Sequence, residues 1–214
     1  MDSPDFLFFD MGNVLITFDM WEICERMAKV AGVDANVVSD KFFGATGILW
    51  DAEAGRVTSD ELHDAFCRLT GTCPDKYELN AAACSTFAVH TPMLPLLVSL
   101  KRAGNRIGIL SNICEAHWLW CMDHYRFLTD IFDCRLASYA LKCSKPSPEI
   151  FAKAAQIAGT TVGKQLSADR IFFTDDIACN VEGAVAAGWD ADVFTDVPTL
   201  AHSLRKRHVP MAVY

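Results

Sequence analysis

The stretch Phe6-Leu7-Phe8-Phe9-Asp10-Met11-Gly12-Asn13 decides the fold of this chain. Four consecutive apolar residues that run into a polar, glycine-containing loop are typical of a short strand covered on both faces. The same pattern recurs at residues 106–110 before Ser111-Asn112, at 171–174 before Asp175-Asp176, and at 192–194 before Thr195-Asp196. The sequence therefore predicts several buried strands, each ending in polar residues.

Helical stretches separate these strands. They are expected at residues 95–103, 115–127, 148–158 and 179–187. Alternation of strand and helix favours an α/β fold with a doubly wound parallel sheet.

One long segment interrupts the alternation. Residues 17–89 show helical patterning: Trp21, Cys24, Met27 and Ala28 share one face, and a start signal at 58–61 precedes a second face with Leu62, Ala65, Phe66 and Leu69. We therefore expect a core made of residues 1–16 and 90–214, and a helical cap made of residues 17–89. A lobe inserted after a strand's carboxyl end lies over the edge where α/β folds bind ligands.

Composition and charge exclude several classes of protein. The chain has 214 residues, 51% of them apolar, with 19 basic and 27 acidic residues and a formal net charge of −8. This acidic balance argues against nucleic-acid partners and anionic membranes, which require clustered positive charge. With no apparent export signal, we expect a cytoplasmic location. The sequence leaves the oligomeric state open.

The nine cysteines are scattered and include no CxxC pair. Without an export signal, a disulfide framework is not expected. Cys114, His117, Cys121 and His124 lie on one predicted helix face and are residue types that bind zinc. One straight helix cannot enclose an ion with all four, because the first and last lie roughly 15 Å apart along its axis. Packing as small apolar residues is the favoured interpretation of the cysteines on that face.

Polar residues at the strand ends carry the chemistry. Asp10, Ser111, Asp175 and Asp176 each follow a predicted parallel strand, so they should meet at one edge of the sheet. Lys145 precedes a helix start at Ser147-Pro148 and can point to the same edge. Clustered carboxylates repel one another unless a cation joins them, and oxygen ligands with a phosphate suit Mg²⁺. A carboxylate can also act as a nucleophile. The set therefore predicts phosphoryl transfer through an aspartyl phosphate.

Four ordered segments resemble the motifs of the haloacid dehalogenase (HAD) superfamily: FLFFDMGNVL, RIGILSN, SKPSPEIF and IFFTDDIACNVEGA. The resemblance implies that Asp10 is the nucleophile and a Mg²⁺ ligand, that the Gly12 carbonyl and Asp176 also bind the metal, and that Asp175 assists through water or by holding Lys145. It implies further that Ser111 and Lys145 hold the transferring phosphate. Asn13 and Asn112 would line the pocket, and Asn180 would fix the acidic loop. The expected substrate is a small phosphorylated metabolite.

The chain departs from this family pattern at Gly12. Most HAD phosphatases have there a second Asp that serves as general acid and base, a role worth about 10²–10⁴-fold in rate. The D-x-G-N-V sequence resembles a subgroup that includes α-D-glucose-1-phosphate phosphatases, whose leaving group needs less protonation. His117 is a candidate substitute acid, and Trp50 and Glu53 could reach a sugar ring from the cap.

Two alternatives stay open at this point. A 2-haloacid dehalogenase would use the same Asp nucleophile without a metal, although the Asp175-Asp176 pair argues against that chemistry. A pseudo-phosphatase would bind a phosphorylated ligand or a partner without turnover, and only Gly12 supports it.

Overall fold

The protein is built around a five-stranded parallel sheet. The computed structural model describes residues 3–44 and 47–212. In space the strands follow the order β5-β4-β1-β6-β7. Their bounds are β1 Phe6–Phe9, β4 Ile107–Ser111, β5 Cys134–Ala137, β6 Ile171–Asp175 and β7 Asp190–Val193. The predicted doubly wound α/β fold is confirmed.

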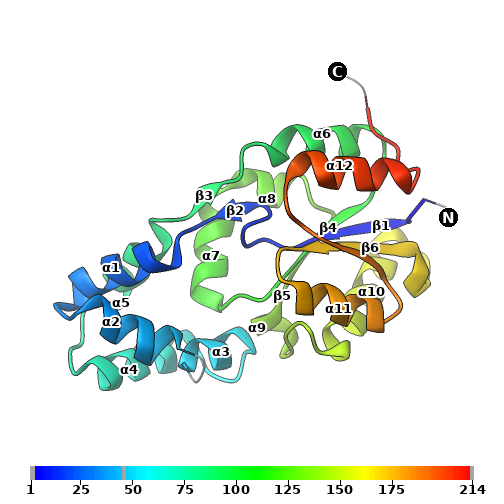
Figure 1. Cartoon of the computed structure of the whole chain (residues 1–214). Helices are drawn as coiled ribbons and strands as arrows, with labels where there is room; N and C mark the ends of the chain where they lie inside the picture. Colours follow the sequence, from blue (N-terminus) through cyan, green and yellow to red (C-terminus); the bar gives the residue numbers. More distant parts are fainter. Residues whose placement is uncertain (1–2, 45–46, 213–214) are drawn as a thin grey trace.

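Helices cover both faces of the sheet, and the alternation along β1 shows why. Leu7 and Phe9 point to the face covered by α6 (Met93–Arg102) and α12 (Val197–Lys206), whereas Phe6 and Phe8 point to the opposite face. That opposite face is covered by α10 (Pro148–Val162) and α11 (Ala178–Ala186) (Figure 1). All four side chains are therefore buried, as a central strand requires.

Some elements differ from the sequence prediction. The edge strand β5 was not predicted, because Arg135 is exposed and interrupts its apolar residues. The last strand begins two residues earlier than expected, at Asp190. The helix expected at 115–127 is two helices, α7 (Glu115–His124) and α8 (Arg126–Asp130), separated by Tyr125.

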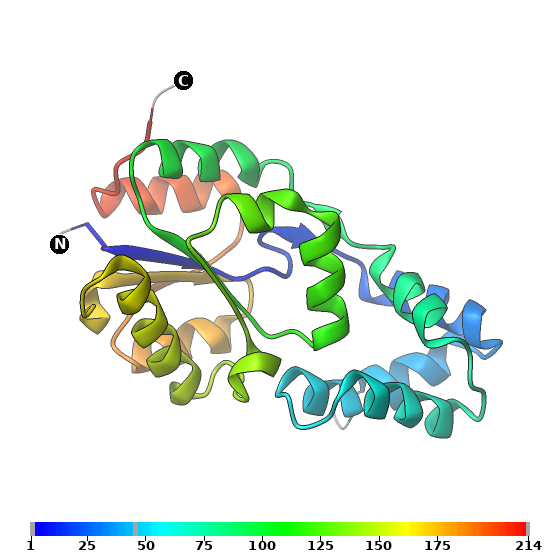
Figure 2. The same ribbon diagram turned by 180° about the vertical axis from the view of Figure 1, so that it is seen from behind.

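A group of helices lies beside the sheet, and we call it the helical cap (Figure 2). It contains α1 (Met20–Ala31), α2 (Ala35–Val38), the π-helix η1 (Ser39–Phe43), α3 (Ile48–Glu53), α4 (Ser59–Thr70) and α5 (Lys76–Cys84). These helices enclose their own apolar cluster. The antiparallel strands β2 (Ile16–Thr17) and β3 (Ala88–Val89) carry the chain into and out of the cap. The domain boundaries at residues 17 and 89 stay a prediction.

The predicted buried faces of the cap helices are only partly confirmed. Trp21 is 47% exposed and donates its indole N–H to Glu25, so Ile23 takes the buried place on α1. Leu69 is likewise partly exposed at the end of α4. The predicted start of α4 is confirmed, because Thr58 and Glu61 form a capping box there.

The cap is docked on the core beside α9 (Ser138–Leu141). Ser138 Oγ donates to the main-chain carbonyl of Glu53 at 2.5 Å, and Lys142 Nζ donates to that of Gly55 at 2.8 Å. Gly55 has a φ of +64°, and a Cβ atom there would lie 2.2 Å from the Tyr139 carbonyl oxygen. Only glycine allows this close approach of the two backbones.

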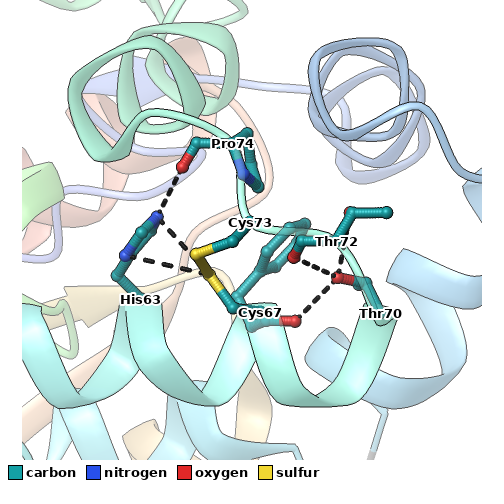
Figure 3. Close-up of a disulfide and its surroundings, with 7 residues drawn as sticks. His63, Cys67, Thr70, Thr72, Cys73 and Pro74 are labelled. Carbon is teal, nitrogen blue, oxygen red and sulfur yellow. Dashed lines mark hydrogen bonds between the residues drawn. A yellow bond between two sulfur atoms is a disulfide. The ribbon is translucent and has the colours of Figure 1, made fainter.

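One disulfide, which the sequence analysis did not expect, lies in the cap. It joins Cys67 near the end of α4 to Cys73 in the loop that follows (Figure 3). His63 lies against the sulfur atoms and donates its Nε2–H to the Pro74 carbonyl at 2.9 Å. The other seven cysteines are unpaired, and six of these are buried, among them Cys114 and Cys121, for which packing is the favoured interpretation.

Reduction of this disulfide should loosen the cap locally. A cross-link that closes so short a loop removes about 2 kcal/mol of unfolded-chain entropy in the simplest account. We expect the double variant Cys67→Ala/Cys73→Ala, and the reduced wild type, to show faster amide hydrogen exchange in α4 and α5. Cys179→Ser, at an exposed unpaired cysteine, should leave the exchange rates unchanged. Equal exchange with and without reductant would contradict the prediction.

Among the described helices, none is long and apolar enough to cross a membrane.

Candidate active site

Three neighbouring strands bring their polar ends together. Asp10, Ser111 and Asp175 lie at the carboxyl ends of β1, β4 and β6, which are adjacent in the sheet. The Asp10 N–H donates to the Thr174 carbonyl at 2.9 Å, which ties the loop after β1 to β6. The predicted meeting of these residues at one sheet edge therefore follows from the strand order.

Lys145 lies at the centre of this cluster and is 4% exposed. Its Nζ donates to Asp10 Oδ1 at 2.7 Å, to Asp175 Oδ2 at 2.5 Å and to the Leu110 carbonyl at 2.9 Å. These three bonds use all the protons of an ammonium group. Lys145 thus holds both carboxylates in place.

The charges of the cluster depend on one another. Burial raises the pKa of Asp10 to about 7; Lys145 opposes this rise and Asp175 adds to it. Burial disfavours the charged form of Lys145, but the two carboxylates outweigh it and raise the lysine pKa. The lysine is therefore cationic at neutral pH, and a further cation would favour the ionised form of Asp10.

Asp175 is fully buried and its two oxygens are engaged. Oδ1 accepts from the Ile177 N–H at 2.8 Å, and Asn180 Nδ2 lies 3.1 Å from each carboxylate oxygen. Asp175 therefore fixes the loop after β6 and holds Lys145. The expectation that Asn180 anchors the acidic loop is confirmed.

Asp176 contacts the loop after β1 across the sheet edge. Its Oδ2 accepts from Asn13 Nδ2 at 3.0 Å, and Asn13 adopts a left-handed φ of +53°, which asparagine tolerates. One oxygen each of Asp10, Asp175 and Asp176 lie within 4.8 Å of one another. This all-oxygen donor set fits a hard divalent cation such as Mg²⁺.

The structure shows what occupies the space beside Gly12. A Cβ atom there would lie 3.3 Å from Phe18 Cε1 and 3.7 Å from Asp10 Oδ2. A longer side chain at residue 12 would therefore enter the space between the Asp10 carboxylate and the Phe18 ring. Phe18 comes from the segment that leads into the cap.

The side chain of Asn112 binds both the N–H and the carbonyl group of Lys145. Its Nδ2 donates to the Lys145 carbonyl at 2.9 Å, and its Oδ1 accepts from the Lys145 N–H at 2.8 Å. Both polar ends of Asn112 are thus used to position the lysine. Its predicted contact with substrate stays a prediction.

A cavity of about 200 Å³ opens over this cluster between the core and the cap. All of the predicted site residues except Asp175 line it. The rest of the lining is mostly apolar: Met11, Ile16, Phe18, Met20, Ile23, Phe43, Leu49, Phe87, Ile113, Cys121 and Ile177. Nothing in the local sequence marks these residues, because docking of the cap brings most of them together.

Trp50 and His117, two of the predicted pocket residues, differ in burial. Trp50 is 54% exposed, and its indole N–H donates to the Gly44 carbonyl at 3.3 Å. The His117 ring packs edge-on against Phe87 at 5.5 Å, and burial lowers its pKa to about 4. His117 is therefore uncharged at neutral pH.

No model of a known protein family matches the chain. Curated proteins that match the chain in sequence include two phosphatases. D-ribitol-5-phosphate phosphatase of Bacteroides thetaiotaomicron is 28% identical over 149 residues, 67% of this chain and 71% of the relative. Phosphatase MT3486 of Mycobacterium tuberculosis is 27% identical over 191 residues, 86% of this chain and 83% of the relative.

Solved structures agree with these relatives. The HAD family enzyme bt-2542 of Bacteroides thetaiotaomicron, solved in complex with magnesium and inorganic phosphate, is 28% identical with a TM-score of 0.79, covering 92% of this chain and 98% of that one. The L-2-haloacid dehalogenase of Xanthobacter autotrophicus, at 18% identity and a TM-score of 0.62 over 96% of this chain and 84% of its own, shares the fold. In its sheet order, its carboxylate–lysine cluster and its sequence, the chain is therefore similar to enzymes of the HAD family of hydrolases.

Proposed function

We propose that this enzyme is a Mg²⁺-dependent phosphatase that hydrolyses a small phosphorylated metabolite through a phosphoaspartate on Asp10. The observation that carries the proposal is the buried Asp10–Lys145–Asp175 cluster beside Asp176. Such a concentration of carboxylates suits a metal and a phosphoryl group together. The curated phosphatase relatives support the same reaction class.

Each residue has a distinct part in this reaction. Asp10, the Gly12 carbonyl and Asp176 would hold Mg²⁺, which neutralises charge on the phosphoryl oxygens. Lys145 keeps the Asp10 carboxylate oriented, and Ser111, at the end of β4, donates to a phosphoryl oxygen. Asn13 keeps Asp176 turned toward Asp10.

The chemistry proceeds in two steps. A carboxylate oxygen of Asp10 bonds to phosphorus while the bond from phosphorus to the ester oxygen breaks, which frees the alcohol once that oxygen gains a proton. Water then bonds to phosphorus, the bond to Asp10 breaks, and inorganic phosphate leaves with the carboxylate restored. The docked cap keeps bulk water away from the phosphoenzyme.

Two substrate classes are proposed for the cavity of about 200 Å³. Sugar 1-phosphates remain a proposal from the D-x-G-N-V sequence, because an anomeric hydroxyl is a good leaving group. Polyol phosphates are a second class, suggested by the D-ribitol-5-phosphate phosphatase relative.

A panel of phosphate esters tests the proposed reaction and separates the substrate classes. We expect Mg²⁺-dependent phosphate release from p-nitrophenyl phosphate and from at least one of glucose 1-phosphate, glucose 6-phosphate and ribitol 5-phosphate. A chelator should remove the activity, and added Mg²⁺ should restore it, because clustered carboxylates without a cation repel the anionic substrate. Turnover unaffected by chelation would contradict the metal-dependent reaction, and halide release from a 2-haloacid would favour a dehalogenase instead.

A further inference from the structure

Glu53 belongs to the helical cap, and the site described above gives no role to its carboxyl group. It ends α3 and lines the cavity together with Asp10 and Lys145. Among the described residues, its side chain has no hydrogen-bond or ion-pair partner. A half-buried carboxyl group without a partner, facing a nucleophile, calls for a chemical explanation.

Its main chain is held firmly, although the carboxyl group is free. Ser138 Oγ binds the Glu53 carbonyl, and Lys142 binds the carbonyl of Gly55 two residues later. Both contacts come from the core, so docking of the cap fixes where Glu53 stands relative to Asp10.

The reaction needs a proton donor on the side of the cap. In an in-line displacement the leaving oxygen departs opposite the attacking Asp10, and Asp10 lies at the edge of the core sheet. The leaving oxygen therefore faces the cap. Gly12 offers no acid, and the Phe18 ring lies beside it.

The other candidate acid is unsuitable. His117 lines the same cavity, but burial lowers its pKa to about 4. At neutral pH the ring is not an imidazolium and has no readily donated proton.

We propose that Glu53 is the general acid and base of this hydrolase. This inference rests on the proposed phosphatase function. The protonated carboxyl group donates its proton to the ester oxygen as the bond from that oxygen to phosphorus breaks. The resulting carboxylate then accepts a proton from the water that attacks the phosphoaspartate, which restores the acid for the next cycle.

The electrostatic environment is consistent with this role. Burial raises the pKa of Glu53 to about 7, with the Asp10 charge adding to the rise and Lys145 opposing it. The other ionisable groups that line the same cavity are Asp176, from the loop after β6, and His117 and Cys121 of α7. A general acid works best with a pKa near the operating pH.

The test compares substrates that differ in their need for a proton. The p-nitrophenolate anion is a good leaving group and departs without gaining a proton. An alkoxide is a poor leaving group and must be protonated as it departs, so a general acid matters only for alkyl phosphates. We expect Glu53→Gln to lower kcat/KM for ribitol 5-phosphate or another accepted alkyl phosphate by about 10²–10⁴-fold. For p-nitrophenyl phosphate the loss should be less than about tenfold, because kcat/KM reports only the steps up to departure of the leaving group.

The proposed action of Glu53 as general base in the second step predicts a separate kinetic result. Without the base, hydrolysis of the phosphoaspartate becomes slow, so Glu53→Gln should release a burst of about one p-nitrophenol per active site before a slow steady state. A merely structural residue would not produce this burst. Asp51→Asn is the matched control, since Asp51 lies on the same helix with its carboxylate paired to Arg56.

The outcomes are distinct. Equal losses of kcat/KM on the two substrates, or no loss on the alkyl ester, would overturn the assignment of Glu53 while wild-type turnover still supported the phosphatase. Absence of Mg²⁺-dependent turnover by the wild type on every ester would overturn the proposed function and this inference with it. Circular dichroism of Glu53→Gln should match the wild type, because the amide has the same shape as the carboxylic acid.

Discussion

Asp10→Asn is expected to abolish Mg²⁺-dependent phosphate release, with kcat reduced by at least about 10⁴-fold. The carboxamide is a far weaker nucleophile and cannot form the phosphoaspartate. It also removes one of the negative oxygens that would hold the metal. Phosphate release from the best ester of the panel measures the effect, and mass spectrometry of acid-quenched wild type should find one added phosphoryl group that the variant lacks.

Asp51→Asn serves as a control for loss of one carboxylate elsewhere in the chain. Its charge pairs with Arg56 at a partly exposed site, so its kcat should stay within about twofold of the wild type. If Asp10→Asn kept turnover within about tenfold of the wild type, a covalent route through Asp10 would be excluded.

Lys145→Met is expected to lower the free energy of unfolding by about 3–5 kcal/mol, and to remove activity as well. The variant keeps a long apolar stem but leaves the Asp10 and Asp175 carboxylates buried without their shared cation. The energetic cost arises from those unpaired charges rather than from lost packing. Urea unfolding followed by circular dichroism measures it.

The loss should depend on pH in a definite direction. Without Lys145, the pKa of Asp10 in the folded state rises further above its value in the unfolded chain, because the lysine opposes that rise in the wild type. A carboxyl group with a raised pKa in the folded state stabilises the fold at low pH, and this stability is lost as the pH rises through the folded-state pKa. The deficit of Lys145→Met should therefore grow as the pH rises above about 7, and should be larger at about pH 8 than at about pH 5.

Lys153→Met is the matched control, because Lys153 is a partly exposed lysine that pairs with Glu149 one helical turn earlier. It should cost less than about 1 kcal/mol at either pH. Equal destabilisation by the two variants would show that Lys145 does not neutralise the buried cluster.

The central strands and the site edge could be predicted because local pattern determines them. Strands β1, β4 and β6 are mostly apolar and are buried along their whole length, and the polar residues proposed for the chemistry stand at their carboxyl ends. Since parallel strands align their carboxyl ends, the meeting of Asp10, Ser111 and Asp175 followed from the strands alone.

The parts that could not be predicted depend on tertiary packing. Strand β5 lies at the sheet edge, where one residue, Arg135, can remain exposed. Trp21 stays at the surface although its spacing suited the buried face of α1. The Cys67–Cys73 bond depends on how the loop after α4 turns back, which no spacing rule reveals.

The same limit applies inside the site. Sequence patterns indicated Glu53 as a contact for a sugar ring, but its position opposite Asp10 depends on how α3 docks against α9. Likewise, the low pKa of His117 arises from burial under the cap. The roles of Asn13, Asn112, Trp50 and the metal ligands stay predictions.

The contact between Gly55 and the Tyr139–Lys142 turn has a consequence for inhibition. The proposed nucleophile, Asp10, belongs to the core and the proposed proton donor, Glu53, to the cap, and this contact joins the core to the cap. A phosphate ester too bulky for the cap to close over it would still occupy the phosphate site, yet meet no proton donor. Rejected esters should therefore act as competitive inhibitors, and the enzyme should discriminate among metabolites by turnover rather than by affinity.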